Sequence, residues 1–199
     1  MKNVQLREGS EFDLVRRMLG RWGNLAQGIG DDAVLLDMAP QKRLVVSTDA
    51  SVENVHFRRD WLQPREIGYR ATAAALSDLA AMAATPTGIL VALTLPESWK
   101  PEIDHIADGI GEAVSLASTR IVGGDLSEGR ELAITVTVLG DVEHPLTRDA
   151  ARAGDRVYVT AFLGGPAAAL SALLDGRKPS KETRERFAHP LPALVKVSG

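Results

Sequence analysis

The spacing of hydrophobic positions changes several times along the 199-residue chain, and each change marks a predicted element. In residues 100–118, apolar side chains recur at helical spacing, with Ile103, Ile106 and Ile110 on one face. Shorter runs rich in Val, Ile and Leu are typical of strands. The pattern predicts helices over 11–19, 64–84, 100–118 and 166–174, and strands over 33–38, 43–48, 88–95, 120–122, 131–140 and 156–160.

The order of these elements predicts an α+β fold. A mixed β-sheet is expected to form an N-terminal domain covered by helices on one face. A polar turn separates the strands 33–38 and 43–48, which we expect to pair as a hairpin. A joint near 144–154 divides the chain into this domain, 1–145, and the start of a second α/β domain, 146–199. Because one strand and short helices cannot form a core alone, the tail either packs on the first domain or belongs to an incomplete one; we favour the second.

Composition narrows the classes of function. The net charge is −3, which disfavours a general nucleic-acid binder because such proteins need a basic face. The absence of cysteine excludes disulfides, thiolate metal sites and cysteine nucleophiles. The first residues lack the apolar stretch of a signal peptide, and no apolar run is long enough to span a membrane. A cytoplasmic protein is therefore expected.

Acidic residues lie beside or inside several apolar segments. They include Asp32, Asp49, Asp78 and Asp125. Asp78 is the only charged residue in 71–84, and no Lys or Arg lies within five residues of it. A buried, unpaired carboxylate costs several kcal/mol unless a cation binds it. Taken singly, each acid could cap a helix or close a turn. Together, with three of them expected at strand ends, they indicate a magnesium site, because Mg²⁺ prefers oxygen ligands.

Known nucleotide-binding signatures fit poorly. The segment GIGDDA matches the glycine pattern of dinucleotide-binding folds, but that pattern should follow a strand and open a helix. Here a predicted strand follows it, and two aspartates would repel a pyrophosphate. The Walker sequence and the protein-kinase motifs H-R-D and D-F-G are absent.

Five segments, in order, resemble the motifs of the thiamine-monophosphate kinase family. They are GIGDDAVLL, VVSTDASVENVHF, LSDLAAMAATP, IVGGD and PLTRDAARAGDRVYVT. The resemblance covers almost the whole chain, and the conjunction of motifs is far more specific than any one of them. The wider superfamily includes aminoimidazole ribonucleotide synthetase, selenophosphate synthetase and a hydrogenase-maturation enzyme. It implies ATP-dependent chemistry in a groove between dimerised sheet domains, and hence a homodimer formed through the N-terminal domain.

The resemblance also implies roles for individual residues. Side-chain or backbone oxygens of six residues would bind several Mg²⁺ ions: Asp32, Ser47, Thr48, Asp49, Asp78 and Asp125. Gly124, Asp125 and Arg148 would contact ATP, and His56 would contact thiamine monophosphate. Simpler interpretations remain open: His56 could be a histidine bonded to backbone, Arg148 an ion-pair partner of Asp149 or Asp155, and Gly124 part of a tight turn.

The sequence departs from the family pattern at several positions. Asn54 and Ala83 replace residues that are usually glycine, and Ala75 replaces a usual asparagine. The S-D-G-L and G-G-E-D-Y motifs that normally follow in the family are not in this sequence. The chain is therefore expected to be a truncated form whose own activity is open.

The reaction implied is ATP-dependent phosphorylation of thiamine monophosphate to thiamine diphosphate. No acid or base residue is proposed, because the attacking oxygen belongs to an already ionised phosphate. One alternative is another ATP-dependent enzyme of the superfamily, among which the lack of cysteine disfavours selenophosphate synthetase. The other is a non-catalytic nucleotide-binding or dimerisation module.

Overall fold

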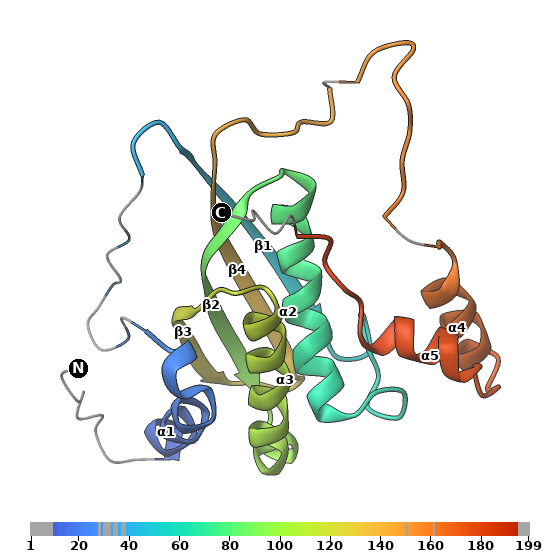
Figure 1. The fold of residues 1–199 in the computed structure, drawn as a ribbon. Helices are drawn as coiled ribbons and strands as arrows, with labels where there is room; N and C mark the ends of the chain where they lie inside the picture. Colours follow the sequence, from blue (N-terminus) through green and yellow to red (C-terminus); the bar gives the residue numbers. More distant parts are fainter. Residues whose placement is uncertain are drawn as a thin grey trace.

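A mixed β-sheet forms the centre of the protein. The computed structural model describes residues 10–27, 29, 33, 36, 39–149, 151–160 and 162–194. Within them the strand order is β1-β4-β2-β3 (Figure 1). The strands are β1 (Arg43–Val52), β2 (Thr85–Leu95), β3 (Ile121–Glu128) and β4 (Ala133–Val142). β4 pairs antiparallel with β1 and β2, and β2 and β3 are parallel.

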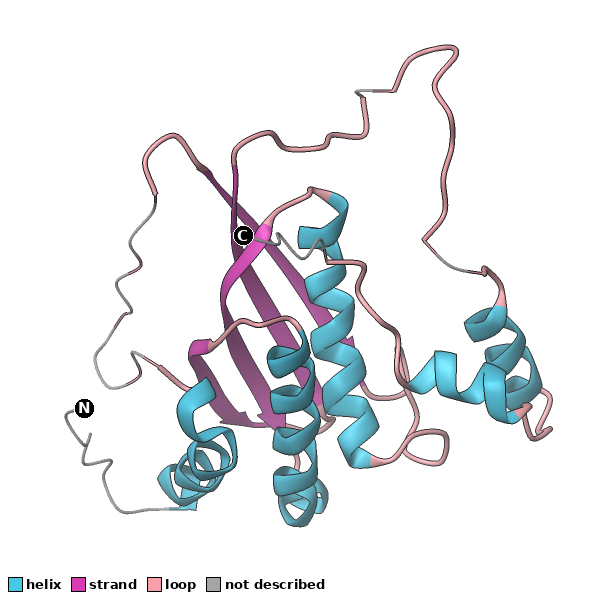
Figure 2. Cartoon of the chain, viewed as in Figure 1, coloured by secondary structure: helices cyan, strands magenta, loops and turns pink. Residues whose placement is uncertain are grey.

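Three helices cover one face of this sheet (Figures 1 and 2), which confirms the predicted α+β class. They are α1 (Ser10–Trp22), α2 (Pro64–Ala81) and α3 (Ile103–Leu116). Two 3-10 turns, η1 (Gly23–Leu25) and η2 (Glu97–Glu102), extend α1 and precede α3. No helix among the described residues is long and apolar enough to cross a membrane.

Alternation along β4 shows how the sheet builds the core. Ile134, Val136 and Val138 are fully buried on the helix side, and the residues between them are only partly covered. β2 presents Ile89, Val91 and Leu93 to the same side. Because side chains of a strand alternate between faces, the helices bury one set and leave the other on the open face.

The helices α2 and α3 pack at unusually close range. A Cβ atom on Gly109 would overlap the carbonyl oxygen of Arg65, and one on Gly68 would overlap the carbonyl of Ile106. Only glycine allows two backbones to approach this closely. This contact holds α2, which carries Asp78, in a fixed place over the sheet.

The tail forms a separate helical pair beside α2. It consists of α4 (Gly165–Leu174) and α5 (Lys181–Ala188) (Figure 1). No element was predicted over the charged residues of α5, but Ser180 caps this helix by accepting a bond from the Thr183 N–H at 3.3 Å. Arg184 of α5 forms an ion pair with Glu66 of α2 at 2.7 Å.

The predicted strand 156–160 is wrong. These residues have no helix or strand and are exposed, with Val157 at 94% and Tyr158 at 79% exposure. A strand needs a neighbour to satisfy its backbone, and none lies beside this segment in the described part of the chain. The predicted strand 33–38 lies mostly outside the described residues, as does Asp32, so the expected hairpin stays a prediction. On its described side, β1 pairs with β4.

Two acids expected at strand ends lie inside strands. Asp49 sits opposite Val136 within β1, which continues to Val52, and Asp125 sits opposite Ala92 within β3. Both strands are longer than predicted because β4 and β2 offer pairing partners along their whole length.

Candidate active site

The closest contact between predicted site residues joins Ser47 and Asp78. The Ser47 hydroxyl donates to Asp78 Oδ2 at 2.6 Å, connecting the edge strand β1 to the last turn of α2. The two residues are 31 positions apart, so the fold rather than local sequence brings them together. One carboxylate oxygen of Asp78 is engaged by this bond, and lone pairs remain on both oxygens for a cation.

Asp78 lies at an unfavourable end of its helix. The carboxyl end of a helix carries partial negative charge and favours cations. The last turn of α2 contains no basic residue, and no ion pair to Asp78 occurs among the described residues. Asp78 is exposed, so water lowers this cost, but a bound divalent ion would remove it. This position gives the magnesium prediction a physical basis beyond composition.

Asp49 and Thr48 point to different faces of β1. Asp49 lies two residues beyond Ser47, on the face covered by α2. Thr48 lies on the open face, where its hydroxyl is 3.0 Å from the hydroxyl of Thr137 on β4. The side chain of Thr48 therefore faces away from Asp78, and its contribution to a shared ion would come from its backbone carbonyl.

Asp125 and Gly124 lie on β3, at the far edge of the sheet. The strands β4 and β2 separate β3 from β1, which puts their backbones roughly 14 Å apart at ordinary strand spacing. Asp125 lies opposite Ala92 of β2, which in turn lies opposite Thr135 of β4. Asp49 lies opposite Val136, the next residue of β4, whose side chain points to the other face. The side chains of Asp49 and Asp125 therefore leave the sheet on opposite faces.

A hollow of about 160 Å³ lies between α1 and β3. Gly123–Leu126 form one side, and Val15, Met18 and Trp22 of α1 form another. Close packing within the sheet explains why residue 124 is a glycine: a Cβ atom on Gly124 would overlap the carbonyl oxygen of Val91 on β2. The glycine would therefore be required by the sheet even without a nucleotide.

His56 lies in a tight loop after β1 and lines a larger hollow. The imidazole Nδ1 of His56 accepts a bond from the Val52 N–H at 3.1 Å, and the backbone N–H of His56 donates to the Val52 carbonyl at 2.8 Å. The side chain is thus bonded to backbone, as the simpler interpretation expected, but it is also exposed. With Nδ1 as acceptor, the ring proton of neutral His56 resides on Nε2.

The hollow beside His56 measures about 370 Å³ and joins both parts of the chain. Asp49, Arg70 and Ser77 line it from β1 and α2, and Phe187 and Pro190 line it from the tail. It is the place where two predicted site residues, Asp49 and His56, share one cavity. Sequence reasoning missed Arg70 and Phe187 because neither lies in a motif that the resemblance singled out.

Arg148 lies apart from both hollows. It is exposed in the segment that follows β4, and no ion pair with Asp149 or Asp155 occurs in the described residues. Asp155 instead accepts a bond from the Arg152 N–H at 2.8 Å. A hydrogen bond from Thr147 lowers the pKa of Asp149.

The four predicted carboxylates do not form one cluster in the part of the chain that is described. No group of three His, Asp or Glu residues there could hold a metal ion, and Asp32 lies outside it. Ser47, Asp49 and Asp78 gather where β1 meets α2, and Gly124 and Asp125 lie at the other edge. The metal and ligand roles stay predictions.

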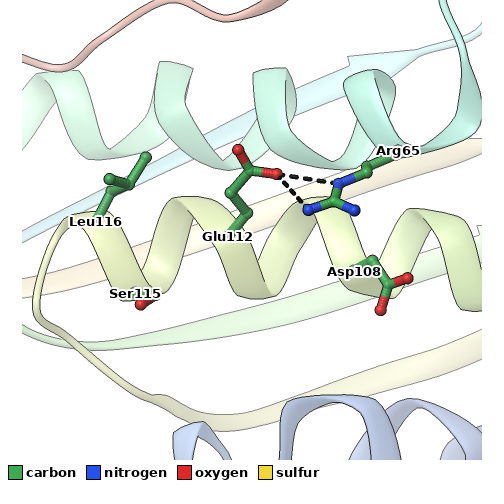
Figure 3. Close-up of a pocket in the computed structure, with 5 residues that line it drawn as sticks. All are labelled: Arg65, Asp108, Glu112, Ser115 and Leu116. Carbon is green, nitrogen blue, oxygen red and sulfur yellow. Dashed lines mark hydrogen bonds and ion pairs between the residues drawn. The ribbon is translucent and has the colours of Figure 1, made fainter.

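A further depression, about 420 Å³, contains none of the predicted site residues (Figure 3). It lies between α2 and α3, where Arg65 and Glu112 form an ion pair at 2.9 Å. Leu116 and Ser115 lie further along α3 (Figure 3). The remaining charged residue of the lining, Asp108, is paired with Arg21 of α1, so each charge here already has a partner.

The two replaced glycines both fall where the backbone is left-handed. Asn54 has φ of +62° and Ala83 has φ of +56°. Asparagine tolerates this conformation, whereas alanine does so at a cost. Ala83 follows α2 in a helix-ending motif in which the Ala84 N–H donates to the Leu79 carbonyl. Ala75 is fully buried, so the usual asparagine there would need a buried partner.

Comparison with known proteins assigns the family. Residues 30–142 match the model of the AIR synthase related protein, N-terminal domain. The chain belongs to this family. Curated relatives are thiamine-monophosphate kinases: the Bacillus subtilis (strain 168) protein is 37% identical over 182 residues, covering 88% of this chain, and the Escherichia coli (strain K12) protein is 36% identical over 197 residues, covering 93%. The chain spans 56% and 60% of their lengths.

Solved structures agree with this assignment. The thiamine-monophosphate kinase from Stenotrophomonas maltophilia K279a superposes with a TM-score of 0.78 at 34% identity, covering 92% of this chain and 62% of that one. A complex of AaThiL with AMPPCP and TMP gives a TM-score of 0.72 at 28% identity, covering 96% and 62%. The described fold is thus that of the N-terminal part of such proteins.

Proposed function

We propose that this chain is the N-terminal part of an enzyme that transfers the γ-phosphoryl group of ATP to thiamine monophosphate, forming thiamine diphosphate. The observation that carries the proposal is the contact between Ser47 and Asp78 at the carboxyl end of α2, whose last turn contains no basic residue. Supporting it, relatives that match over most of this chain are thiamine-monophosphate kinases, and a similar structure binds AMPPCP and TMP.

The donor set suits Mg²⁺. Carboxylates and hydroxyl or carbonyl oxygens are the ligands that this ion prefers, and it accepts phosphate oxygens as further ligands. Asp49, Asp78 and Ser47 would supply the ligands at the β1–α2 junction. Asp32, Asp125 and the carbonyl of Thr48 would complete the sites for several ions. When bound, the ions would neutralise the phosphate oxygens that face each other.

The chemistry requires alignment more than proton transfer. The attacking oxygen is an ionised phosphate oxygen, so no side chain has to remove a proton. The obstacle is repulsion between two anions, and the protein reduces it by orienting both and by charge neutralisation. We place thiamine monophosphate in the hollow lined by His56 and Asp49. The proposed ATP contacts are Gly124, Asp125 and Arg148. Because Gly124 and Asp125 lie at the opposite edge of the sheet from this hollow, ATP of one copy would have to meet thiamine monophosphate of the other across the proposed dimer groove.

The open sheet face favours a homodimer. Leu44 and Val46 of β1 are half exposed on this face, and no described helix covers it (Figure 1). A second copy that covers this face would bury them and form a groove between the two sheets. We further propose that 146–199 begins a second domain, since Val157, Tyr158 and Phe162 stay exposed. A cytoplasmic location completes the proposal.

Calorimetry and an ATP-consumption assay test the function. Purified chain should bind AMPPCP only with Mg²⁺ present and consume ATP with thiamine monophosphate but not with other phosphate monoesters. Turnover with a different acceptor would instead identify another enzyme of the superfamily.

A non-catalytic module is the second candidate, because the described residues contain no group of three acids that could hold a metal. Magnesium-dependent AMPPCP binding without ATP consumption would support this candidate. Absence of any AMPPCP binding would contradict both functions and leave dimerisation as the role.

A further inference from the structure

Arg70 occupies an unusual position in the middle of α2. Its guanidinium is half-buried at the hollow that contains His56, and Nη1 donates to the His56 carbonyl at 3.2 Å. Burial lowers the pKa of Arg70, and the negative charge of Asp49 acts against that shift. Arginine remains charged under these conditions, so a full positive charge is held inside the cavity wall.

The tail fixes this guanidinium from its other side. The ring of Phe187 in α5 lies against it, with 4.8 Å between the guanidinium carbon and the ring centroid. Phe187 is only 4% exposed. A cation against an aromatic face is attracted by the ring, which favours the side-chain conformation of Arg70 that keeps this contact.

The loop that carries His56 is fixed to the core on both sides of the histidine: Phe57, directly after it, is buried and its ring lies edge-to-face with that of Trp99. At its start, Glu53 accepts a bond from Trp99 Nε1 at 2.8 Å, which fixes the loop to the core. At its end, α2 contacts the backbone of His56 through the hydrogen bond from Arg70 to the His56 carbonyl. The imidazole orientation follows from this backbone, because its Nδ1 accepts from Val52 four residues earlier.

We propose that Arg70 is a positioning residue for His56, and that Phe187 holds Arg70 in the position in which it does so. Docking of α5 thereby sets the orientation of the His56 Nε2–H in the substrate hollow. The inference rests on the proposed function only in taking His56 as a contact to a phosphate ester. By this proposal the tail contributes to substrate recognition through Arg70, in addition to forming one wall of the cavity.

The first test needs no ligand. Long-range proton–nitrogen NMR of the imidazole reports which ring nitrogen carries the proton, and the chain has only four histidines to assign. The full chain should show His56 protonated on Nε2 alone. Arg70→Met and Phe187→Leu should each shift His56 toward a mixture of tautomers. An unchanged His56 signature in folded Arg70→Met protein would overturn the proposal.

A matched control separates this effect from loss of any cation–aromatic pair. Arg58 lies over the ring of Trp61 at 4.7 Å, outside both hollows. Arg58→Met should leave the His56 signature unchanged. If Arg70→Met does not fold, Arg70→Lys keeps the charge but loses the planar group; it should give a smaller shift of the same sign, and no shift would overturn the proposal.

The second test adds thiamine monophosphate. Arg70→Met should weaken its binding about tenfold, equivalent to roughly 1.4 kcal/mol. In a His56→Ala background the same change should have almost no further effect, because Arg70 acts through His56. Equal weakening in both backgrounds would show a general structural role and overturn the proposal. Failure of unaltered chain to bind thiamine monophosphate would refute the proposed function instead, and the tautomer experiment would still decide the positioning role.

Discussion

The helix-covered sheet, 43–142, and the tail, 151–194, are held together in different ways. In the first part, buried Ile, Leu and Val side chains from helices and strands interlock, and α2 and α3 touch backbone to backbone at Gly68 and Gly109. In the tail, Ala169, Ala172, Phe187 and Ala188 are buried, but Val157, Tyr158, Phe162 and Leu163 are mostly exposed. The tail relies on a small set of polar and aromatic contacts with α2.

This difference separates the predicted site residues into two kinds. Ser47, Asp49 and Asp78 lie on β1 and α2 of the packed part, so we expect them to keep their places whether or not the tail is docked. The cavity beside His56 exists only while Phe187 and Pro190 form its far wall. If the proposed sites are correct, metal binding should therefore survive changes in the tail, and recognition of thiamine monophosphate should not.

The largest expected effect comes from Asp78, in the packed part. Asp78→Asn removes a charge that would bind Mg²⁺ and should slow phosphoryl transfer about 100-fold or more, roughly 2.7 kcal/mol of barrier. The fold should be unaffected because Asp78 is exposed. Steady-state kinetics with ATP and thiamine monophosphate measure the effect. Asp60→Asn, at a surface ion pair with Arg58, is the control. Normal turnover of Asp78→Asn would refute the metal site.

A second effect of about the same size, on stability rather than on rate, tests how tightly the packed part is assembled. Gly109→Ala should destabilise the protein by about 3 kcal/mol, since the added methyl group overlaps the backbone of α2 at Arg65. Chemical denaturation followed by circular dichroism measures the free energy of unfolding. Gly20→Ala in α1, where a Cβ meets nothing within 4 Å, is the matched control. Equal stability of the two variants would contradict the close helix contact.

A smaller effect concerns the docking of the tail. Burial raises the pKa of Glu66. The hydrogen bonds from Arg184 and from the Gln63 N–H lower it by more than burial raises it, so the pKa is below its ordinary value. A lowered folded-state pKa gives stability above the unfolded pKa and loses it as pH falls through the folded value. Docking of α5 should therefore weaken as the pH falls below about 4.5, the ordinary pKa of a glutamate.

Glu66→Gln measures this contribution. It should cost about 1 kcal/mol at neutral pH, because a partly buried ion pair is lost. It should also remove most of the acid dependence of docking, which hydrogen exchange of α5 amides follows. Glu97→Gln, at an exposed ion pair with Lys100, is the control. Undiminished acid dependence in Glu66→Gln would show that another group controls docking.

The smallest effect lies at the end of α2. Ala83→Gly should stabilise the protein by about 0.5–1 kcal/mol, because glycine adopts the left-handed conformation without strain. The midpoint of thermal unfolding should rise accordingly. Gly176→Ala, at the equivalent position after α4, should give a loss of similar size but confined to the tail. A loss on Ala83→Gly would contradict the assigned backbone conformation.

Much of the fold was predictable from the sequence because periodicity reports burial. The helices over α1, α2, α3 and α4 were predicted within a few residues. The amphipathic pattern of α3 fixes its buried face almost by itself. The helix α5 was not predicted because most of its residues are polar and only Phe187 and Ala188 are buried. Its sequence therefore has no hydrophobic pattern with helical spacing.

The site was less predictable for a different reason. Local sequence identified acids in apolar surroundings, but it could not tell which face of a strand each would occupy. Asp49 and Asp125 were both expected to gather with Asp78, and strand pairing puts their side chains on opposite faces. Arg70 gave no signal either, because a single Arg in a helix resembles any surface residue until Phe187 is brought beside it.

The exposed segment between the sheet and α4 offers trypsin three accessible peptide bonds, after Arg148, Arg152 and Arg156. One cut there would leave the α4–α5 fragment attached only through its non-covalent contacts with α2. The fraction of the fragment that co-elutes with the larger piece would then give a dissociation constant for the junction. A single covalent chain would thus be converted into a bimolecular complex whose strength can be titrated.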